Sequence, residues 1–198
     1  MIVAVLKHAL FVQTRPRVSE GSIRYMEVLS HPNAALKQIA QPVDPATDDA
    51  LKELCRKMAQ AMYDAPGIGL AAPQIGVLKR VIIYDLDEDS PGVVALCNPQ
   101  IVESSERCEF DDEGCLSLPG ITIPIERSCT VVCEAQTLTG RVVRIEAEGL
   151  HARLLQHEID HLDGVLMIDR ASPEERKAAL RRYLEAQLAG AKPGQTSI

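Results

Sequence analysis

The chain has 198 residues, a length that predicts one domain with one sizeable hydrophobic core. Apolar residues make up 46% and charged residues 25% of it, the proportions of an ordinary soluble globular protein. The formal net charge of −7 argues against a protein whose whole surface binds nucleic acid, and we expect no direct sequence-specific binding. Aromatic residues at 3% and the absence of Trp argue against the stacking surfaces of single-strand binders.

The cysteines and the amino-terminal segment bear on the compartment. Six cysteines occur without CxxC pairs, which favours a reducing, bacterial-type cytoplasm and mostly free thiols. No apolar run approaches the roughly 18 residues that span a bilayer, so we expect no membrane-embedded segment. Residues 1–25 carry basic side chains and no acid before Glu20, a balance that leaves organelle targeting open. We interpret this segment as a non-catalytic extension.

The first predicted helix lies in "ATDDALKELCRKMAQAMYDAPG", residues 46–67. Apolar residues recur in it at helical spacing, Thr47 is the expected N-cap, and Pro66-Gly67 ends the element. Two short runs rich in Val, Ile and Leu follow and predict buried strands at residues 81–86 and 93–99.

Residues 129–149 predict a hairpin that turns near Thr139-Gly140. Cys129 and Cys133 lie four apart on its first strand and therefore share one face of the sheet. We interpret this pair as core packing rather than as metal ligands.

Two further helices are predicted after this hairpin. One runs from Leu150 to about Leu162, and the other covers residues 172–188 with Ser172 as N-cap and Pro173 at its first position. Residues 189–198 are expected to form a disordered tail. The mixture predicts a single α+β domain in which small, mostly antiparallel sheets pack around the helix at 150–162, with a C-terminal helix.

The stretch "QHEIDH" (residues 156–161) lies in the first of these helices and has the HExxH pattern. Because residues four apart lie on the same helix face, His157 and His161 are able to hold one metal ion. Glu158 projects toward the neighbouring face, from which it reaches a water molecule at the metal and serves as a general base. The alternative is that these are two ordinary helix histidines.

Such a pair needs a third protein ligand. The extended pattern HExxHxxGxxH finds Gly164 in place but Met167 where the third histidine belongs, and a thioether is a poor ligand for such an ion. Glu174 and Glu175 follow too closely for a return helix. These failures direct the search upstream of the helix.

Two upstream stretches have suitable chemistry. "DDEGCLSLPG" (residues 111–120) contains Cys115, whose thiolate would complete a Cys-His-His set with one open position, as in catalytic sites. "GIGLAAPQ" (residues 67–74) combines glycines that let a ligand approach the backbone with Gln74, whose amide is able to donate to a developing oxyanion. An ordinary buried cysteine and a tight turn are the alternatives for these two stretches.

The three stretches "GIGLAAPQ", "EGCLS" and "QHEIDH", in this order, resemble the three motifs of the peptide deformylases. The resemblance extends over residues 26–188, which it marks as the catalytic domain. It implies that Fe²⁺, or Zn²⁺, Co²⁺ or Ni²⁺ in its place, is held by Cys115, His157 and His161. It also implies that Glu158 is the acid/base and that the oxyanion is stabilised by the Gln74 amide and the Leu116 backbone N–H.

The implied reaction is hydrolysis of the formamide of N-formylmethionyl peptides, which releases formate. We expect the methionine side chain to enter an apolar pocket lined by Ile68, Gly69, Leu150 and Leu154. One departure from the family is visible, since many members have an arginine where this chain has Thr122. Arg127 is considered as a substitute for that arginine in contacts with the substrate backbone.

Three other functions are weighed against this one. A zinc endopeptidase would share the HExxH helix but would cleave unformylated peptides. A binding protein that has lost catalysis is disfavoured, because every residue of the three motifs is intact. A ribosome-associated module would use basic residues of the last helix, namely Arg176, Lys177, Arg181 and Arg182, although such residues more often form a solvated face.

Overall fold

The computed structural model describes residues 26–86 and 92–194. The expectations for residues 1–25 and for the last part of the tail, residues 195–198, lie outside this range. None of the helices within it combines the length and the apolar character that crossing a membrane requires.

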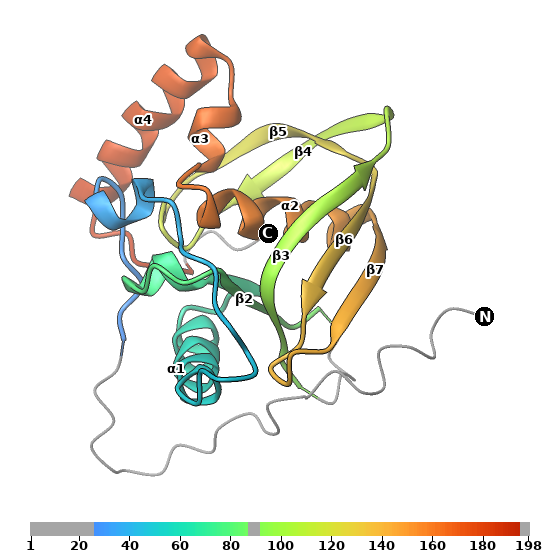
Figure 1. Cartoon of the computed structure of the whole chain (residues 1–198). Coiled ribbons are helices and arrows are strands. Elements are labelled where there is room, and N and C mark those ends of the chain that lie inside the picture. Colours follow the sequence, from blue (N-terminus) through green and yellow to red (C-terminus); the bar gives the residue numbers. More distant parts are fainter. Residues whose placement is uncertain (1–25, 87–91, 195–198) are drawn as a thin grey trace.

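The described chain alternates short helices with antiparallel strands (Figure 1). In chain order the elements are η2 (Ala34–Lys37), α1 (Leu51–Asp64), β1 (Gly69–Ala71), η3 (Ala72–Ile75), β2 (Val81–Tyr84), β3 (Val94–Ser104), β4 (Cys108–Gly114), β5 (Thr122–Ser128), β6 (Thr130–Gln136), β7 (Val142–Glu148), α2 (Gly149–Leu162), α3 (Met167–Arg170) and α4 (Pro173–Leu188).

The strands form two separate sheets. Five of them pair antiparallel in the order β1-β2-β3-β6-β7, and β4 pairs only with β5 in a two-stranded hairpin. The β6–β7 hairpin turns at Gly140, which has a positive φ of 80°, as the sequence predicted. The expected α+β class with antiparallel sheets is therefore confirmed.

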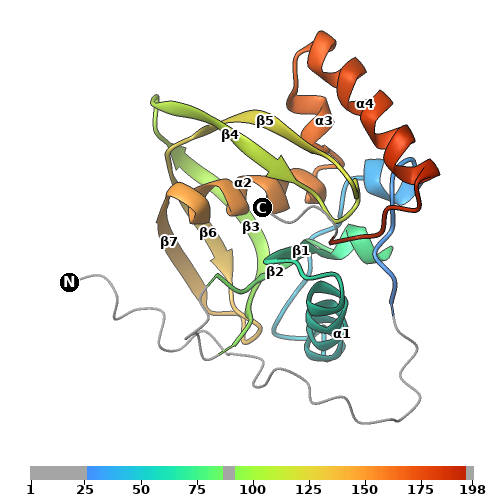
Figure 2. The ribbon, with the colours of Figure 1, turned by 180° about the vertical axis from the view of Figure 1, so that it is seen from behind.

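Helix α2 lies between the five-stranded sheet and the β4–β5 hairpin, as the two opposite views show (Figures 1 and 2). Its apolar side chains, among them Leu155, Ile159 and Leu162, are buried in one cluster with strand residues such as Ile82 and Leu96. The other side of the helix faces the hairpin. This arrangement places the HExxH segment in the middle of the molecule.

The start of α1 differs from the prediction. The residue before the helix is Ala50, which makes no side-chain cap, and Thr47 lies in the preceding turn. There the Thr47 hydroxyl donates to Asp44, 2.9 Å away, and the side chain of Asp48 accepts from the Ala50 N–H at 3.2 Å. The N-cap prediction for Thr47 was wrong because Asp44 takes its hydroxyl.

The carboxyl-terminal helix agrees with the prediction. The Ser172 side chain accepts from the Glu175 N–H at 3.1 Å, and Pro173 is the first residue of α4. The helix docks through Tyr183, whose hydroxyl donates to the His31 carbonyl at 2.7 Å. Residues 189–194, part of the segment expected to be disordered, are described, and Ala191 lies close to Gly120 of the body.

Of the two cysteines near β6 that were expected to pack in the core, Cys133 does so. Cys133 is fully buried in the core beneath the five-stranded sheet, whereas Cys129 precedes β6 and is only half-buried. Neither belongs to a group of metal-ligating side chains among the described residues.

Candidate active site

Three potential metal ligands meet between α2 and the end of β4. Cys115 follows the last residue of β4, and His157 and His161 lie on successive turns of α2. One ligand atom from each of them lies within 4.8 Å of the others, and Cys115 Sγ is 3.3 Å from His161 Nε2. The structure thus brings together the three residues that the sequence suggested.

The chemistry of this donor set fits a divalent transition metal ion. A thiolate and two imidazoles in a three-ligand set leave one coordination position open, as catalytic sites require. Burial, followed by the neighbouring His157, lowers the pKa of His161 well below its usual value, which favours the neutral ring that metal ligation requires. Its Nδ1 is buried and accepts no hydrogen bond from a described residue.

Glu113 orients the His157 ring. Its Oε2 lies 2.9 Å from His157 Nδ1, which directs the other ring nitrogen toward Cys115 and His161. Burial by itself raises the pKa of Glu113, but hydrogen bonds from His157 and Arg127 outweigh burial and hold the pKa well below its usual range. Glu113 is therefore an ionised acceptor behind the ligand set.

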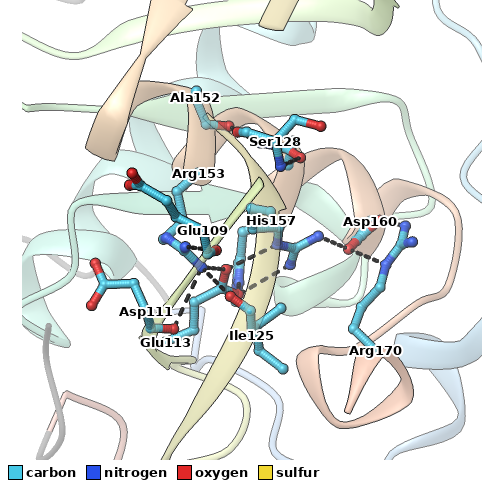
Figure 3. A network of polar contacts seen from close by, with 12 residues as sticks. Glu109, Asp111, Glu113, Ile125, Ser128, Ala152, Arg153, His157, Asp160 and Arg170 are labelled. Atoms are coloured by element: carbon cyan, nitrogen blue, oxygen red, sulfur yellow. Dashed lines mark hydrogen bonds and ion pairs between the residues drawn. The ribbon is translucent and has the colours of Figure 1, made fainter. Parts of the chain in front are cut away.

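Two arginines also donate hydrogen bonds to the Glu113 carboxylate (Figure 3). Arg127 donates to both oxygens of Glu113, from Nε at 2.9 Å and from Nη2 at 3.0 Å, and Arg153 donates to Oε1 at 2.8 Å. Arg127 also pairs with Asp160 at 2.5 Å, and Asp160 accepts in turn from Arg170, which reaches the surface. A continuous polar network thus supports His157 from the side away from Cys115.

Glu158, unlike Glu113, is buried without charged hydrogen-bond donors around its Oε2. It is 5% exposed, and its Oε2 has no hydrogen-bond partner among the described residues. Burial raises the pKa of Glu158 to about 7; the His157 charge opposes this shift and the Glu113 charge adds to it. A buried carboxylate with a free oxygen and a pKa near neutrality is suited to accept and return a proton.

Gln74 holds its amide in one orientation. Its Oε1 accepts from the Ala71 N–H at 2.8 Å, and its Nε2 then faces Ser117 Oγ at 3.2 Å and Cys115 Sγ at 3.8 Å. The donor end of the amide is therefore the end that faces the ligand set. The Leu116 N–H lies in the turn that starts at Cys115 and forms no hydrogen bond with another residue of the described part of the chain.

Two glycines of the first motif lie close to side chains of the site. A Cβ on Gly69 would lie 2.5 Å from Glu158 Oε1, and one on Gly67 would lie 2.7 Å from a methyl group of Leu116. Strand β1 thus passes close to the acid/base candidate because residue 69 is a glycine.

A pocket opens beside the ligand set. The four residues expected there, Ile68, Gly69, Leu150 and Leu154, all line it. Glu158, His157, Cys115, Gln74 and Leu116 also line this pocket, as does Gly67 of the first motif. Further lining residues that the sequence did not suggest are Pro66, Glu113, Gly114 and Arg153.

Arg127 does not reach this pocket. It is 5% exposed, its guanidinium is bonded to Glu113 and Asp160, and it lines a separate groove. The suggestion that it contacts the substrate in place of the arginine absent at Thr122 was therefore wrong, because two buried carboxylates hold it.

The sequence reasoning missed Glu113 and Arg153. One signal for Glu113 was available, because it lies two residues before Cys115 in the middle motif. Arg153 also had a signal, since it shares a face of α2 with His157 and Asp160, at spacings of four and seven residues. Charged residues at such spacing on a helix that is otherwise buried indicate a polar contact.

Comparisons with known proteins agree with this geometry. The family model described as polypeptide deformylase matches residues 25–177. A peptide deformylase of Acidothermus cellulolyticus is 49% identical over 152 residues, which cover 75% of this chain and 82% of that protein. A peptide deformylase structure from Legionella pneumophila is 39% identical, with a TM-score of 0.77 over 83% of this chain and 96% of that chain. One from Synechococcus elongatus, in complex with actinonin, is 41% identical, with a TM-score of 0.75 over 79% of this chain and 86% of that chain.

Proposed function

The chain belongs to the peptide deformylase family, the enzymes that remove the N-formyl group from nascent polypeptides, and we propose how its own residues divide this work. The observation that carries the proposal is the convergence of Cys115, His157 and His161 beside a pocket that the unpartnered Glu158 also lines. All of these residues lie within residues 26–188, the range that we assign to the catalytic domain.

The ligand set holds a divalent ion, for which we propose Fe²⁺ with Zn²⁺, Co²⁺ and Ni²⁺ as functional replacements. The ion supplies Lewis-acid chemistry to the attacking water and the formyl carbonyl. Cys115 provides a soft thiolate, and His157 and His161 provide imidazole nitrogens, a set that suits each of these ions. In support, Glu113 fixes the His157 ring at 2.9 Å in the orientation that ligation needs.

Glu158 performs both proton transfers. It takes a proton from the attacking water as the water oxygen bonds to the formyl carbon, and it returns that proton to the amine nitrogen as the C–N bond breaks. Formate and a free amino terminus are the products. Its Oε2, which has no partner among the described residues, supports this role, because an oxygen without donors has its lone pairs available for the proton.

Two donors stabilise the negative charge that grows on the formyl oxygen. They are the Gln74 amide, whose Nε2 faces the ligand set, and the Leu116 backbone N–H. Loss of one such donor typically costs about 3 kcal/mol in transition-state stabilisation. Both groups are held by the fold before substrate arrives, so no reorganisation is needed.

The methionine side chain of the substrate occupies the pocket. Leu154 is buried and Leu150 is 48% exposed, so the wall formed by α2 runs from the interior to the surface. Ile68 and the Gly69 backbone form the facing wall. An unbranched apolar side chain such as methionine suits a pocket of this composition.

The test is formate release from formyl-Met-Ala-Ser by anaerobically purified protein, with metal analysis of the same sample. We expect formate release from formyl-Met-Ala-Ser. We expect no cleavage of internal peptide bonds in longer unformylated peptides. Cleavage of such peptides without formate release would favour the HExxH zinc endopeptidase instead. Metal content also tests the ligand set, because Cys115→Ser should lose the ion while Cys133→Ser keeps it.

Besides formylated peptides, we propose the ribosome as a partner, bound through α4. Arg176 and Arg182 are engaged in ion pairs with Asp169 and Glu175, which leaves Lys177 and Arg181 as exposed cations. Pelleting with ribosomes should therefore weaken in a Lys177→Glu and Arg181→Glu double variant with unchanged formate release. Equal pelleting of both proteins would contradict this role.

We also propose a cytoplasmic location, with organelle targeting by residues 1–25 as the alternative. Substrates of this class are made by ribosomes that initiate with formylmethionine, so the enzyme has to share their compartment. A fluorescent fusion with and without residues 1–25 distinguishes the two locations.

A further inference from the structure

Helix α2 has two differently built faces. One face is apolar and packs on the five-stranded sheet through residues such as Leu155 and Ile159. The other faces the β4–β5 hairpin and carries Arg153, Gln156, His157 and Asp160, which recur at helical spacing. The metal ligands come from both partners of this second contact, because Cys115 follows β4 whereas both histidines lie on α2.

The contact between α2 and the hairpin is mainly polar. Along β4 Glu113 is the one fully buried residue. The buried apolar side chains of β5, Ile123 and Ile125, pack in a separate cluster with residues of α3 and α4. Apolar packing therefore fixes the hairpin to the carboxyl-terminal helices more than to α2. Hydrogen bonds and ion pairs have to set how the hairpin sits against the histidine-bearing helix.

Arg153 makes the largest share of these bonds on the pocket side. Its Nη1 donates to Glu113 Oε1 and to the Ile125 carbonyl, each at 2.8 Å, and its Nη2 donates to the Glu109 carbonyl at 2.9 Å. One side chain on α2 thus bonds both strands of the hairpin and the carboxylate that orients His157 (Figure 3). The planar guanidinium makes this possible, because its donors point in several fixed directions.

The other polar bonds lie on the far side of the hairpin. Arg127, Asp160 and Gln156 line a groove that is separate from the pocket. The Gln156 side chain donates to the Ser128 carbonyl at 3.0 Å and accepts from the Ser128 N–H at 3.2 Å. Arg153 lines the pocket instead. Arg153 also donates to the Asp111 carbonyl at 3.5 Å. Without Arg153 the pocket side of the contact would lose four bonds and leave three strand carbonyls and a buried carboxylate with fewer partners.

We propose that Arg153 is a positioning residue that holds the β4–β5 hairpin against α2 and so keeps Glu113 and Cys115 in register with His157. The inference rests on the metal site of the proposed function. Arg153 is not one of the three proposed ligands, and its effect would reach them through Glu113, to which it donates at 2.8 Å. Its expected signature is therefore weaker metal retention in a protein that remains folded.

The experiment measures metal release from Co²⁺-loaded protein after addition of excess chelator, followed by the thiolate-to-cobalt absorption. Arg153→Met keeps the length of the side chain but has no donor, and we expect release about tenfold faster or more, as for other groups that orient metal ligands. Arg153→Lys keeps the charge but lacks the fork, so we expect an intermediate rate. Release at the wild-type rate in Arg153→Met would overturn the proposal.

Two control variants separate positioning from general effects. Arg144→Met removes a surface arginine that pairs with Glu103 and Glu134, and it should release metal at the wild-type rate. Met58→Ala removes a buried side chain of α1 and lowers the melting temperature without touching the helix–hairpin contact. If Met58→Ala releases metal as fast as Arg153→Met, Arg153 acts through overall stability and the proposal fails.

Circular dichroism of the metal-free proteins checks folding. If Arg153→Met does not fold, Arg153→Lys decides alone, and a wild-type release rate in it overturns the proposal. The readout also separates this inference from the proposed function. Wild-type protein that binds Co²⁺ but releases no formate from formyl-Met-Ala-Ser would refute the function and leave Arg153 testable, whereas failure to bind any divalent ion would refute both.

Discussion

Two buried glutamates, Glu113 and Glu158, lie close to His157 and differ in their hydrogen-bond partners and in the direction of their pKa shifts. Glu113 accepts from His157, Arg127 and Arg153, so both of its oxygens are bonded. Glu158 is one residue along the helix from His157, yet its Oε2 is buried without a partner among the described residues. The pKa of Glu113 is held below its usual range and that of Glu158 is raised to about 7.

The difference shows how one site uses the same side chain for two tasks. A carboxylate with several charged donors stays ionised and rigid, so it is able to orient a ligand but not to exchange protons. A carboxylate without donors is costly to keep ionised in a buried place, and protonation relieves that cost. Substitutions of the two residues should therefore have different signatures.

The largest expected effect is the loss of turnover in Glu158→Gln. The substitution preserves size but removes the proton carrier, and general acid-base assistance is typically worth about 10² to 10⁴ in rate. Metal content and formyl-peptide binding should stay near those of the wild type. Metal analysis, peptide binding and kcat on one preparation test this. Near-normal turnover, or loss of the metal, would break the distinction between the two glutamates.

Gly69→Ala should disturb Glu158 without changing its chemistry. The added methyl group would lie 2.5 Å from Glu158 Oε1, so the carboxylate has to move away, and a displacement of about 1 Å in such a group can cost about 10² in rate. We expect kcat to fall by about this factor while metal content is kept. Unchanged kcat in Gly69→Ala at full metal content would argue against this displacement.

Glu113→Gln should show the converse signature. An amide places an NH₂ group against the donors of Arg127 and His157, so the His157 ring loses its fixed orientation. Changes in such groups typically lower metal affinity by about 10 to 100-fold. Competition with a metal indicator dye measures the affinity. Glu126→Gln, an exposed neighbour on β5, is the control and should have the wild-type affinity. An unchanged affinity in Glu113→Gln would remove the orienting role.

The smallest effect is expected at a third carboxylate, which has strong partners but lies near the surface. Burial raises the pKa of Asp169, but hydrogen bonds from Lys37 and from the Leu166 N–H outweigh it and lower the pKa from its ordinary value of 3.8. A lowered pKa in the folded state stabilises the protein above the ordinary value, and this stabilisation is lost as the pH falls through the folded-state pKa.

Asp169→Asn should therefore cost less than about 1 kcal/mol at pH 7, as for other exposed pairs. The difference in melting temperature from the wild type should shrink as the pH is lowered below 3.8. Thermal unfolding of metal-free protein over a pH series measures it. A difference that grows toward acid would contradict the sign of the shift.

The parts of the fold that the sequence predicted are those with a local signal. Helix α4 has a serine cap followed by proline, and α2 has a regular pattern of buried residues, so both were placed within a residue or two. Strand β4 was not foreseen. It reads "CEFDDEG", almost all of it exposed, and is held by its pairing with β5 rather than by an alternating apolar pattern.

The candidate site divides in the same way. Side chains with distinctive chemistry at fixed spacing, such as His157 and His161, could be chosen from the sequence, and the fold brings them together with Cys115. Arg127 could not be placed, because an arginine is by default a surface residue. The spacing of Arg153 from His157 and Asp160 indicates a polar contact but not its partner. The partner of both arginines is Glu113, which lies 14 residues from Arg127 and 40 residues from Arg153 in the chain, and no local pattern encodes these pairings.

The fixed amide of Gln74 has a consequence for molecules that compete with the substrate. If the amide turned over, its NH₂ group would face the Ala71 N–H, which now donates to Oε1 at 2.8 Å, and two donors would oppose each other in a buried place. The site is therefore selective, at Gln74, for the direction of the hydrogen bond. An inhibitor that presents a carbonyl oxygen at this position gains a bond, whereas an analogue with an amino group there meets a donor that is unable to turn away.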